Sequence, residues 1–269
     1  MTHVVRLPLR SVLTVEGPDA ESFLNGLLTQ STLGMTIGDT RYGALLTPQG
    51  RVIADMLIHK SPLGFDLDCA RLAAPEVERR LQLFKLRSRV TIFPDPTKII
   101  LGLTNGGAQG SRAAPQRSIG RADNPTDTIS LQSFEAARIR AGRPEQGVDF
   151  GVEEVYPSDI NMDLSGGVDF HKGCFVGQEV VSRMKRRTNV RRRTAVLQLS
   201  EDIKDLPSPV FAGEEEIGAI TSASDRLGLA RLRTDRLMSQ GGSPYCETAS
   251  GQPAVVVGPA ELLAELAKS

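Results

Sequence analysis

Cysteine and histidine are scarce in this chain, with three residues of each among 269. Cys69, Cys174 and Cys246 are too few and too widely separated to form a disulfide framework or a CxxC metal motif. The histidines form neither an HxxxH nor an HExxH pattern. The sequence therefore predicts no permanent metal site built from this chain alone.

An excess of charge of one sign is also absent, because 32 Lys and Arg balance 32 Asp and Glu. No global field would attract nucleic acid or an anionic membrane. No apolar run approaches the ~20 residues of a membrane span. The amino-terminal segment MTHVVRLPLRSVLTVEG lacks the apolar core of a secretory signal and the character of a transit peptide. We expect a cytoplasmic bacterial protein with neither a membrane nor a nucleic acid as partner.

The first half of the chain mixes strand and helix patterns. Residues 41–46 and 51–58 flank the turn 47–50 and predict a hairpin, and residues 75–86 predict an amphipathic helix. A strand at 12–15 precedes another helical pattern. Because these elements do not follow a strict βαβ repeat, the fold class predicted is α+β.

The domain organisation predicted is an α+β region at 1–189 and a β-barrel-like domain at 190–269. A stretch rich in Gly, Ser, Pro and Gln near 104–130 is expected to connect two subdomains of the first region. An irregular segment at 143–171 is expected to shape a pocket. The barrel is indicated by short strand patterns at 194–200, 216–222, 227–233 and 254–257.

The octapeptide KGCFVGQE occupies residues 172–179. Gly173 and Gly177 allow a sharp turn or a close approach, which would present Cys174 rather than bury it. Lys172, Arg183 and Lys185 would favour its thiolate if they converged on it, making it nucleophilic or metal-ligating. The alternative is that Cys174 is a small core hydrophobe, as most lone free cysteines are.

Asp55 stands inside the largely apolar strand pattern VIADML. Burying a carboxylate without partners is costly. The residue therefore either faces a polar cavity as a ligand contact or points to solvent through strand alternation, and the sequence leaves both open.

KGCFVGQE resembles the signature of the YgfZ-type folate-binding family at every fixed position. Further resembling segments are GPDAESFLNGLLTQ at 17–30, LLTPQGRVIAD at 45–55, RIRAGRPE at 138–145 and EIGAITSAS at 216–224. The same segments are more distantly similar to the T-protein of the glycine cleavage system, an aminomethyltransferase that uses tetrahydrofolate. The resemblance implies a ring of two α+β subdomains with ferredoxin-like elements and a small β-barrel, around a folate-sized hole.

The resemblance also implies a function: a tetrahydrofolate-binding accessory protein for the assembly, repair or delivery of 4Fe-4S clusters, with Cys174 as the key residue. Expected partners are iron-sulfur scaffold or carrier proteins and client 4Fe-4S enzymes. Because such clusters take four thiolates, Cys174 would share a transient cluster with a partner or exchange with it as a thiol. The positions assigned to cofactor binding by this resemblance are Lys172, Gly173, Gly177, Gln178, Glu179 and Arg183.

Two departures from the transferase weaken the alternative, a tetrahydrofolate-dependent aminomethyltransferase-like enzyme. The transferase has adjacent acidic residues where Ala54 and Asp55 stand here, which leaves Asp55 to assist catalysis. Its pterin-contacting glutamate corresponds to Arg140, which we therefore expect near the cofactor.

The run from 183 to 193 carries seven cations and no acid. It is typical of a solvated linker. RNA binding is disfavoured because the run has no aromatic residue to stack on bases. Within the resemblance, we expect these cations to meet the polyglutamate tail of folate or an acidic protein partner.

Overall fold

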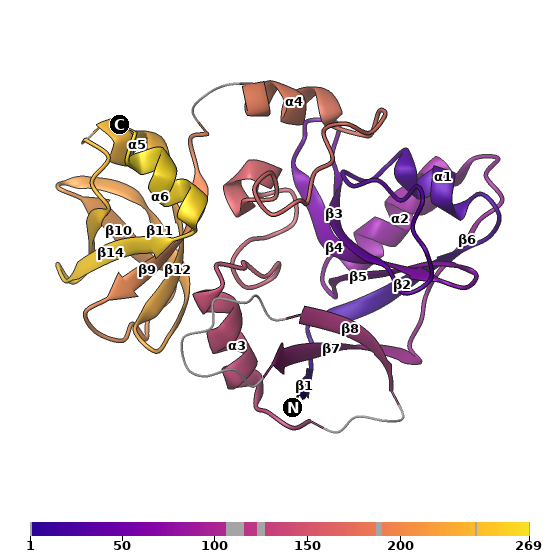
Figure 1. Ribbon diagram of the computed structural model, residues 1–269, viewed down its shortest axis with the longest axis horizontal. Coiled ribbons are helices and arrows are strands. Elements are labelled where there is room, and N and C mark those ends of the chain that lie inside the picture. The colour runs from indigo at the N-terminus through magenta and orange to yellow at the C-terminus, as the bar shows by residue number, and fades with distance from the viewer. Residues whose placement is uncertain (1, 106–115, 123–126, 187–189, 240, 269) are drawn as a thin grey trace.

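The computed structural model describes residues 2–105, 116–122, 127–186, 190–239 and 241–268. Three packed parts surround a central irregular segment (Figure 1). The first is a five-stranded antiparallel sheet in the order β3-β4-β5-β2-β6. Its strands are β2 (Arg10–Glu16), β3 (Thr40–Leu46), β4 (Val52–Ser61), β5 (Gly64–Ala70) and β6 (Thr91–Pro94).

Two helices, α1 (Ala20–Asn25) and α2 (Ala74–Lys85), pack on this sheet and close its main core. The predicted hairpin is confirmed as β3 and β4, and the helix predicted at 75–86 as α2. The helical pattern predicted after the strand at 12–15 is the helix α1, which ends at Asn25. Leu27 and Leu28 nevertheless remain buried in the core.

The second part is a three-stranded sheet in the order β1-β7-β8, with α3 (Leu131–Arg140) beside it. Its strands are β1 (Thr2–Arg6), β7 (Lys98–Asn105) and β8 (Gln116–Arg121). Within the stretch near 104–130 that the sequence predicts as a connection between subdomains, residues 116–121 form the strand β8. Pairing with β7 makes this polar hexapeptide a strand.

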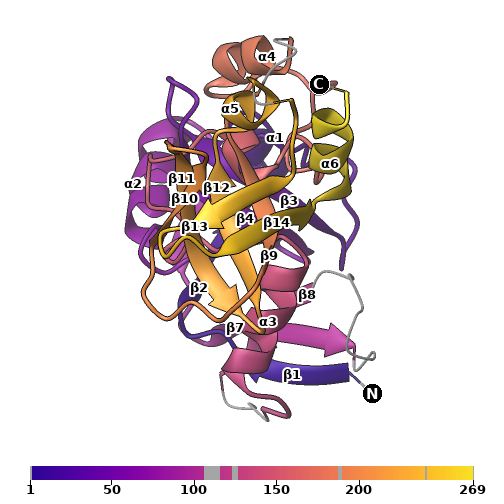
Figure 2. The ribbon, with the colours of Figure 1, turned by 90° about the vertical axis from the view of Figure 1, so that its left-hand side faces the viewer.

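The third part is a closed barrel in the order β10-β11-β12-β9-β14-β13 (Figure 2). Its strands are β9 (Arg193–Leu199), β10 (Ser208–Ala212), β11 (Glu215–Ser224), β12 (Leu227–Leu232), β13 (Tyr245–Thr248) and β14 (Pro253–Gly258). The helices α5 (Thr234–Ser239) and α6 (Ala260–Leu266) lie together against it. The α+β fold class with a carboxy-terminal barrel is confirmed.

The centre of the molecule is occupied by the segment between α3 and α4 (Gln178–Arg186), which contains the 3₁₀ helix η1 (Pro157–Ile160) (Figure 1). Asn161 donates a hydrogen bond to the Thr194 carbonyl of β9 at 2.7 Å, which ties this segment to the barrel. Residues 178–186 form a helix, so the first part of the basic run is not a linker. Arg187 lies outside the described residues.

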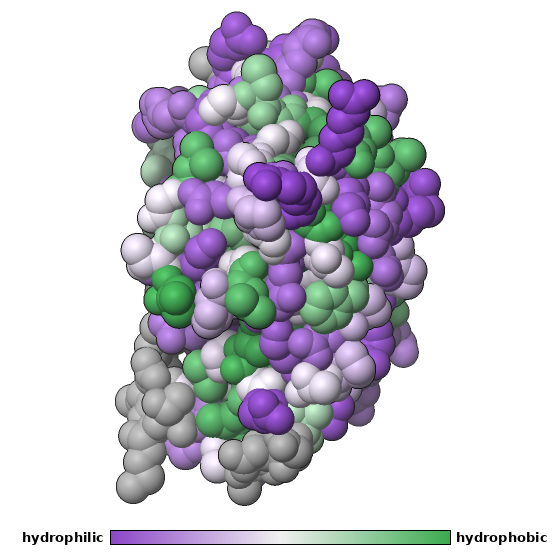
Figure 3. Space-filling view, turned by 90° about the vertical axis from the view of Figure 1, so that its right-hand side faces the viewer, coloured by the Kyte–Doolittle hydropathy of each residue, from purple (hydrophilic) through white to green (hydrophobic). Residues whose placement is uncertain are grey.

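The surface next to α1 and β6 is a mosaic in which small apolar groups alternate with polar side chains (Figure 3). Such scattered exposed apolar residues are normal for a protein surface. Within the described part of the chain, no helix is long and apolar enough to cross a membrane.

Candidate functional site

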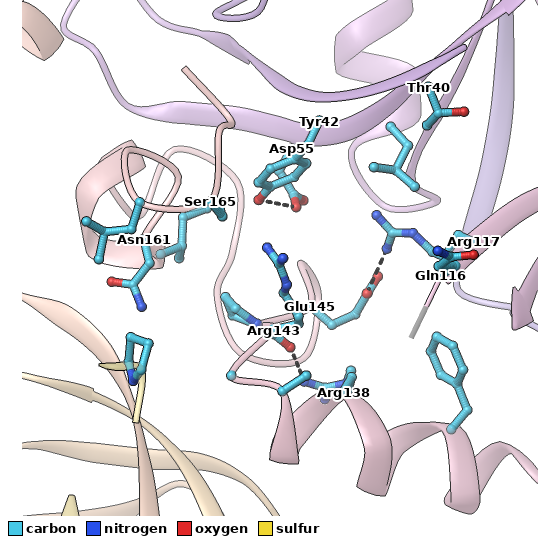
Figure 4. A pocket seen from close by; sticks show the side chains of 18 of the residues that line it. Thr40, Tyr42, Asp55, Gln116, Arg117, Arg138, Arg143, Glu145, Asn161 and Ser165 are labelled. Carbon is cyan, nitrogen blue, oxygen red and sulfur yellow. Dashed lines mark hydrogen bonds and ion pairs between the residues drawn. The ribbon is translucent and has the colours of Figure 1, made fainter. Parts of the chain in front are cut away.

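A cavity of about 690 Å³ opens where the three parts meet, and β3, β4, β8, the end of α3 and the central segment all line it (Figure 4). This volume falls in the range of small-molecule sites, roughly 300–1,000 Å³. Its polar lining includes Thr40, Tyr42, Asp55, Gln116, Arg117, Arg138, Arg143, Glu145, Asn161 and Ser165.

Asp55 is only 3% exposed and faces this cavity, which decides between the two alternatives left by the sequence. The Tyr42 hydroxyl donates to its Oδ2 atom at 3.0 Å, whereas Oδ1 has no hydrogen-bond partner among the described residues. Burial raises the pKa of Asp55, against the opposing field of Arg10. A buried carboxylate oxygen without a partner is costly, so its natural complement is a donor on a ligand.

A network of buried ion pairs supports this wall of the cavity. Arg10 contacts Asp68 at 2.7 Å and Glu145 at 2.8 Å, and Arg117 contacts the same two carboxylates at 2.9 and 3.1 Å. Burial alone would raise the pKa of Asp68, but Arg10 and Arg117 lower it. The network joins β2 and β5 of the first sheet to β8 of the second and to the central segment, and so fixes the cavity's shape.

Arg143 extends from the loop after α3 toward the Tyr42–Asp55 pair (Figure 4). Within the described residues its guanidinium makes no ion pair, although its carbonyl accepts a bond from Arg138 at 3.1 Å. Guanidinium groups bind carboxylates well. The cavity therefore suits a ligand that has a donor edge for Asp55 and an anionic end for Arg143.

No residue of the octapeptide lines this cavity, and its last two residues form the start of α4. Lys172 Nζ donates to three backbone carbonyls at and beyond the end of helix α1, those of Asn25 at 2.6 Å, Leu28 at 2.7 Å and Gln30 at 3.2 Å. Burial lowers the pKa of Lys172 to about 8. Its ammonium group thus anchors the octapeptide to the first part of the fold.

Gly177 fixes the other end of the loop. Its φ is +81°, and an added Cβ would lie 2.6 Å from the Thr47 carbonyl oxygen. Gly173 has open space around it. Between the two glycines, Phe175 is buried in one hydrophobic cluster and Val176 packs against another. The loop is therefore held by its neighbours on both sides of Cys174.

Cys174 is exposed, as expected, whereas Cys69 and Cys246 are buried. Burial raises the pKa of Cys69 and of Cys246 to about 11. Among the described residues, no three His, Cys, Asp or Glu side chains gather to hold a metal. Cys174 is consequently the accessible thiol of the chain, and any metal ligated by it needs further ligands from elsewhere.

The cations expected to converge on Cys174 make other contacts. Arg183 pairs with Glu179 at 2.8 Å along α4, and Lys185 Nζ lies 3.5 Å from the centroid of the Phe170 ring. Gln178 begins α4. Arg183 and Lys185 thus have partners other than the Cys174 thiol.

Arg140 is outside the lining of the cavity, and its guanidinium lies 3.7 Å from Asp225 of the β11–β12 hairpin. Two residues earlier, Arg138 is 2% exposed and contacts Asp149 at 2.7 Å. The predicted site residues thus fall into separate places: Asp55 in the cavity, the octapeptide at the surface, and Arg140 near the barrel.

Sequence reasoning missed Tyr42, Arg143 and the ion-pair network. The register of β3 and β4 pairs Ala44 with Asp55, which brings Tyr42, two residues before Ala44, onto the same face of the sheet. Register cannot be inferred from the hairpin pattern alone. The signal available for Arg143 and Glu145 was the resembling segment RIRAGRPE, which contains both.

Comparisons with known proteins agree with this architecture. A family model described as the CAF17 C-terminal beta-barrel domain matches residues 191–261. The chain is 27% identical to the iron-sulfur cluster assembly factor IBA57 homolog of Coccidioides immitis, over 79% of this chain and 62% of that protein. It is 26% identical to the mitochondrial iron-sulfur cluster assembly factor IBA57 of Mus musculus, over 86% of this chain and 78% of that protein.

The chain thus spans 62% and 52% of the fungal relatives from Coccidioides immitis and Neurospora crassa. Among solved structures, the glycine cleavage system aminomethyltransferase T of Bartonella henselae has a TM-score of 0.73. The match covers 97% of this chain and 86% of that chain at 15% identity. The T-protein-like fold expected from the resemblance is confirmed.

Proposed function

We propose that this chain, a member of the IBA57/CAF17 (YgfZ-type) family of iron-sulfur cluster assembly factors, uses Cys174 as its working thiol and binds a tetrahydrofolate in the central cavity. Its partners are iron-sulfur scaffold or carrier proteins and the 4Fe-4S enzymes that they supply. The relatives named above are described as mitochondrial, so the cytoplasmic location expected from the sequence stays a prediction.

The observation that carries the thiol part is the contrast among the three cysteines. Cys174 is exposed on an anchored loop, while Cys69 and Cys246 are buried and hold their protons more tightly than free thiols. A 4Fe-4S cluster takes four thiolates. Cys174 therefore acts on a cluster together with the cysteines of a second protein, or exchanges with it as a single ligand.

The folate part rests on the chemistry of the cavity. A pterin ring carries adjacent amide and amino N–H donors, which match the unpartnered Oδ1 atom of Asp55. The glutamate end of folate carries carboxylates, which match the guanidinium of Arg143. These residues fit the group: Asp55 would hold the donor edge of the pterin, and Arg143 would attract the anionic part of the ligand.

A tetrahydrofolate-dependent aminomethyl transfer is the second candidate, favoured by the buried Asp55 inside a T-protein-like fold. Arg140, at the position of the transferase's glutamate, contacts the barrel hairpin instead of lining the cavity. If this chain were the transferase, it would transfer methylene from an aminomethyl donor to tetrahydrofolate, and Asp55→Asn would abolish that turnover.

The thiol proposal is tested in a host that lacks its own copy of the protein, with a 4Fe-4S enzyme such as aconitase as the readout. The wild-type chain should restore aconitase activity, and Cys174→Ser should leave it near the level of the empty vector. Cys246→Ala removes a buried thiol and serves as the control, which should restore activity. Full rescue by Cys174→Ser at equal protein level would contradict the proposal.

A further inference from the structure

A second hollow, of about 430 Å³, lies between α4 and the barrel; we call it the α4 groove. Its apolar lining comes from Tyr156, Val180, Met184 and Val190. Its charged lining comes from Arg183, Arg191, Arg192 and Arg233, with Asp159 as the acidic residue. The groove therefore combines an apolar surface with several guanidinium groups.

The positive charge of the α4 groove is only partly neutralised. Arg183 pairs with Glu179, and Arg233 pairs with Asp235 at 2.7 Å. Arg191 and Arg192 are exposed and make no ion pair with any residue that the structure describes. A groove with two such guanidinium groups attracts an anionic ligand.

The wall of the groove formed by Tyr156 and Asp159 is fixed in place. The Asp159 carboxylate accepts a bond from the Tyr156 backbone N–H at 3.0 Å, and the Asp159 carbonyl accepts one from the Thr194 hydroxyl at 2.9 Å. Next to it, Arg193 is buried against Asp163 at 2.8 Å. Because these contacts are made within the chain itself, binding in the groove costs little ordering of this wall.

Two other occupants fit the groove less well. Tyr156 is the aromatic side chain in its lining, and the Arg51 guanidinium lies 4.7 Å from that ring's centroid, so one face of the ring is already covered against stacking by a nucleic acid base. The groove and the central cavity share no lining residue, and η1 stands between them. The tail of a folate bound in the cavity is thus separated from the groove.

We propose that the α4 groove binds an extended acidic segment of a partner protein, in which apolar residues are spaced among the carboxylates. The proposal rests on the proposed function, in which a partner protein meets Cys174. Because α4 begins four residues after Cys174, the thiol and the groove lie on one continuous stretch of chain. Carboxylates meet Arg191 and Arg192, and the apolar residues meet Val180, Met184 and Val190.

The probe is a fluorescein-labelled peptide of repeated Glu-Glu-Leu units, whose binding to the full chain is followed by fluorescence anisotropy. Replacing Leu by Ser should weaken binding because it removes the apolar contacts. Replacing Glu by Gln should weaken binding because it removes the charges that meet Arg191 and Arg192. The variant Arg191→Glu/Arg192→Glu should weaken binding by about tenfold or more, and added salt should weaken binding to the wild type. Arg191→Gln/Arg192→Gln repeats the test with less perturbation of Asp159.

The matched control is Arg87→Glu/Lys204→Glu, which changes the net charge equally at two exposed residues outside the groove. Peptide binding that falls equally in both double variants would overturn the proposal, because it would reflect net charge alone. So would an RNA oligonucleotide or pteroylpentaglutamate that binds through Arg191 and Arg192 while the peptide does not. Cys174→Ser should bind the peptide normally, so a failure of the groove and a failure of the thiol are told apart.

Discussion

The charged groups of the Asp55 cavity and of the Cys174 loop have different kinds of partner. In the cavity, buried arginines and carboxylates from different parts of the fold neutralise one another, and Asp55 Oδ1 has no hydrogen-bond partner in the part of the chain that the structure describes. In the loop, Lys172 donates to backbone carbonyls and Cys174 stands exposed. The first arrangement suits a small ligand that enters a prepared interior, and the second suits contact with another macromolecule.

The octapeptide and the Asp55 cavity therefore have separate roles. Most of the octapeptide serves to anchor and turn the chain: Lys172 and Gly177 hold its ends, and Phe175 fills a core. Gly173, Cys174 and Glu179 are its exposed residues, and Glu179 pairs with Arg183. Most residues of the motif therefore serve to position the Cys174 thiol.

Loss of the Arg138 side chain, which lines the cavity, should give the largest loss of stability. Its guanidinium pairs with Asp149 at 2.7 Å and donates to Ser222 of β11 at 2.9 Å, so it joins α3 to the barrel. Arg138→Met leaves a buried carboxylate without its cation and should lower the free energy of unfolding by about 3–5 kcal/mol. Urea denaturation measures this difference.

Arg140→Met is the control on the same helix. Its partner Asp225 is 67% exposed and 3.7 Å away, so this change should cost about 0.5 kcal/mol or less. Equal losses for the two variants would show that burial of the Arg138 pair does not set the stability of this junction.

Gly177→Ala should give the second largest loss of stability, at the loop that carries Cys174. The positive φ and the 2.6 Å approach of a Cβ to the Thr47 carbonyl force the backbone to shift. We expect a loss of about 2–3 kcal/mol in the free energy of unfolding and a loss of aconitase rescue, because Cys174 would no longer be held in place. Gly173→Ala, which adds a methyl group in open space, should change neither by much. Unchanged stability in Gly177→Ala would mean that the loop does not depend on this contact.

Local pattern predicted much of this fold. The β3–β4 hairpin, α2 and four strands of the barrel have clear apolar periodicity, and each is present. β8 was missed because QRSIGR has a single large apolar residue, and its strand conformation depends on pairing with β7. The sequence alone shows no such pairing.

The site was predicted unevenly for a similar reason. The turn that exposes Cys174 is local, so the two glycines on either side of it in KGCFVGQE, four positions apart, were enough to predict it. The environment of Asp55 is not local, because Arg10 meets Glu145 across 135 positions and Tyr42 reaches Asp55 only through strand register. Contacts between distant segments carry no signal in a single sequence.

Asp55→Asn should raise the free energy of unfolding, by less than Arg138→Met or Gly177→Ala lower it. Because burial raises the pKa of Asp55, the folded chain binds its proton more tightly than the unfolded chain, and stability falls as the pH rises from about 3.9 through the folded pKa. The penalty is complete once the pH lies above the folded pKa. Asparagine removes the charge and still accepts from Tyr42, so the variant should be more stable by about 1 kcal/mol at pH 7, and this gain should shrink as the pH falls.

The same variant should bind tetrahydrofolate more weakly in isothermal titration calorimetry, because an amide is a poorer acceptor for a pterin's donors than a carboxylate. Aconitase activity is then measured in the host that carries Asp55→Asn. Loss of activity would mean that bound folate is needed for cluster assembly, and full activity would mean that it is not. Weaker folate binding together with a gain in stability would show that Asp55 is kept for a ligand at the expense of the fold. A variant that is less stable and binds folate normally would instead make Asp55 a structural residue.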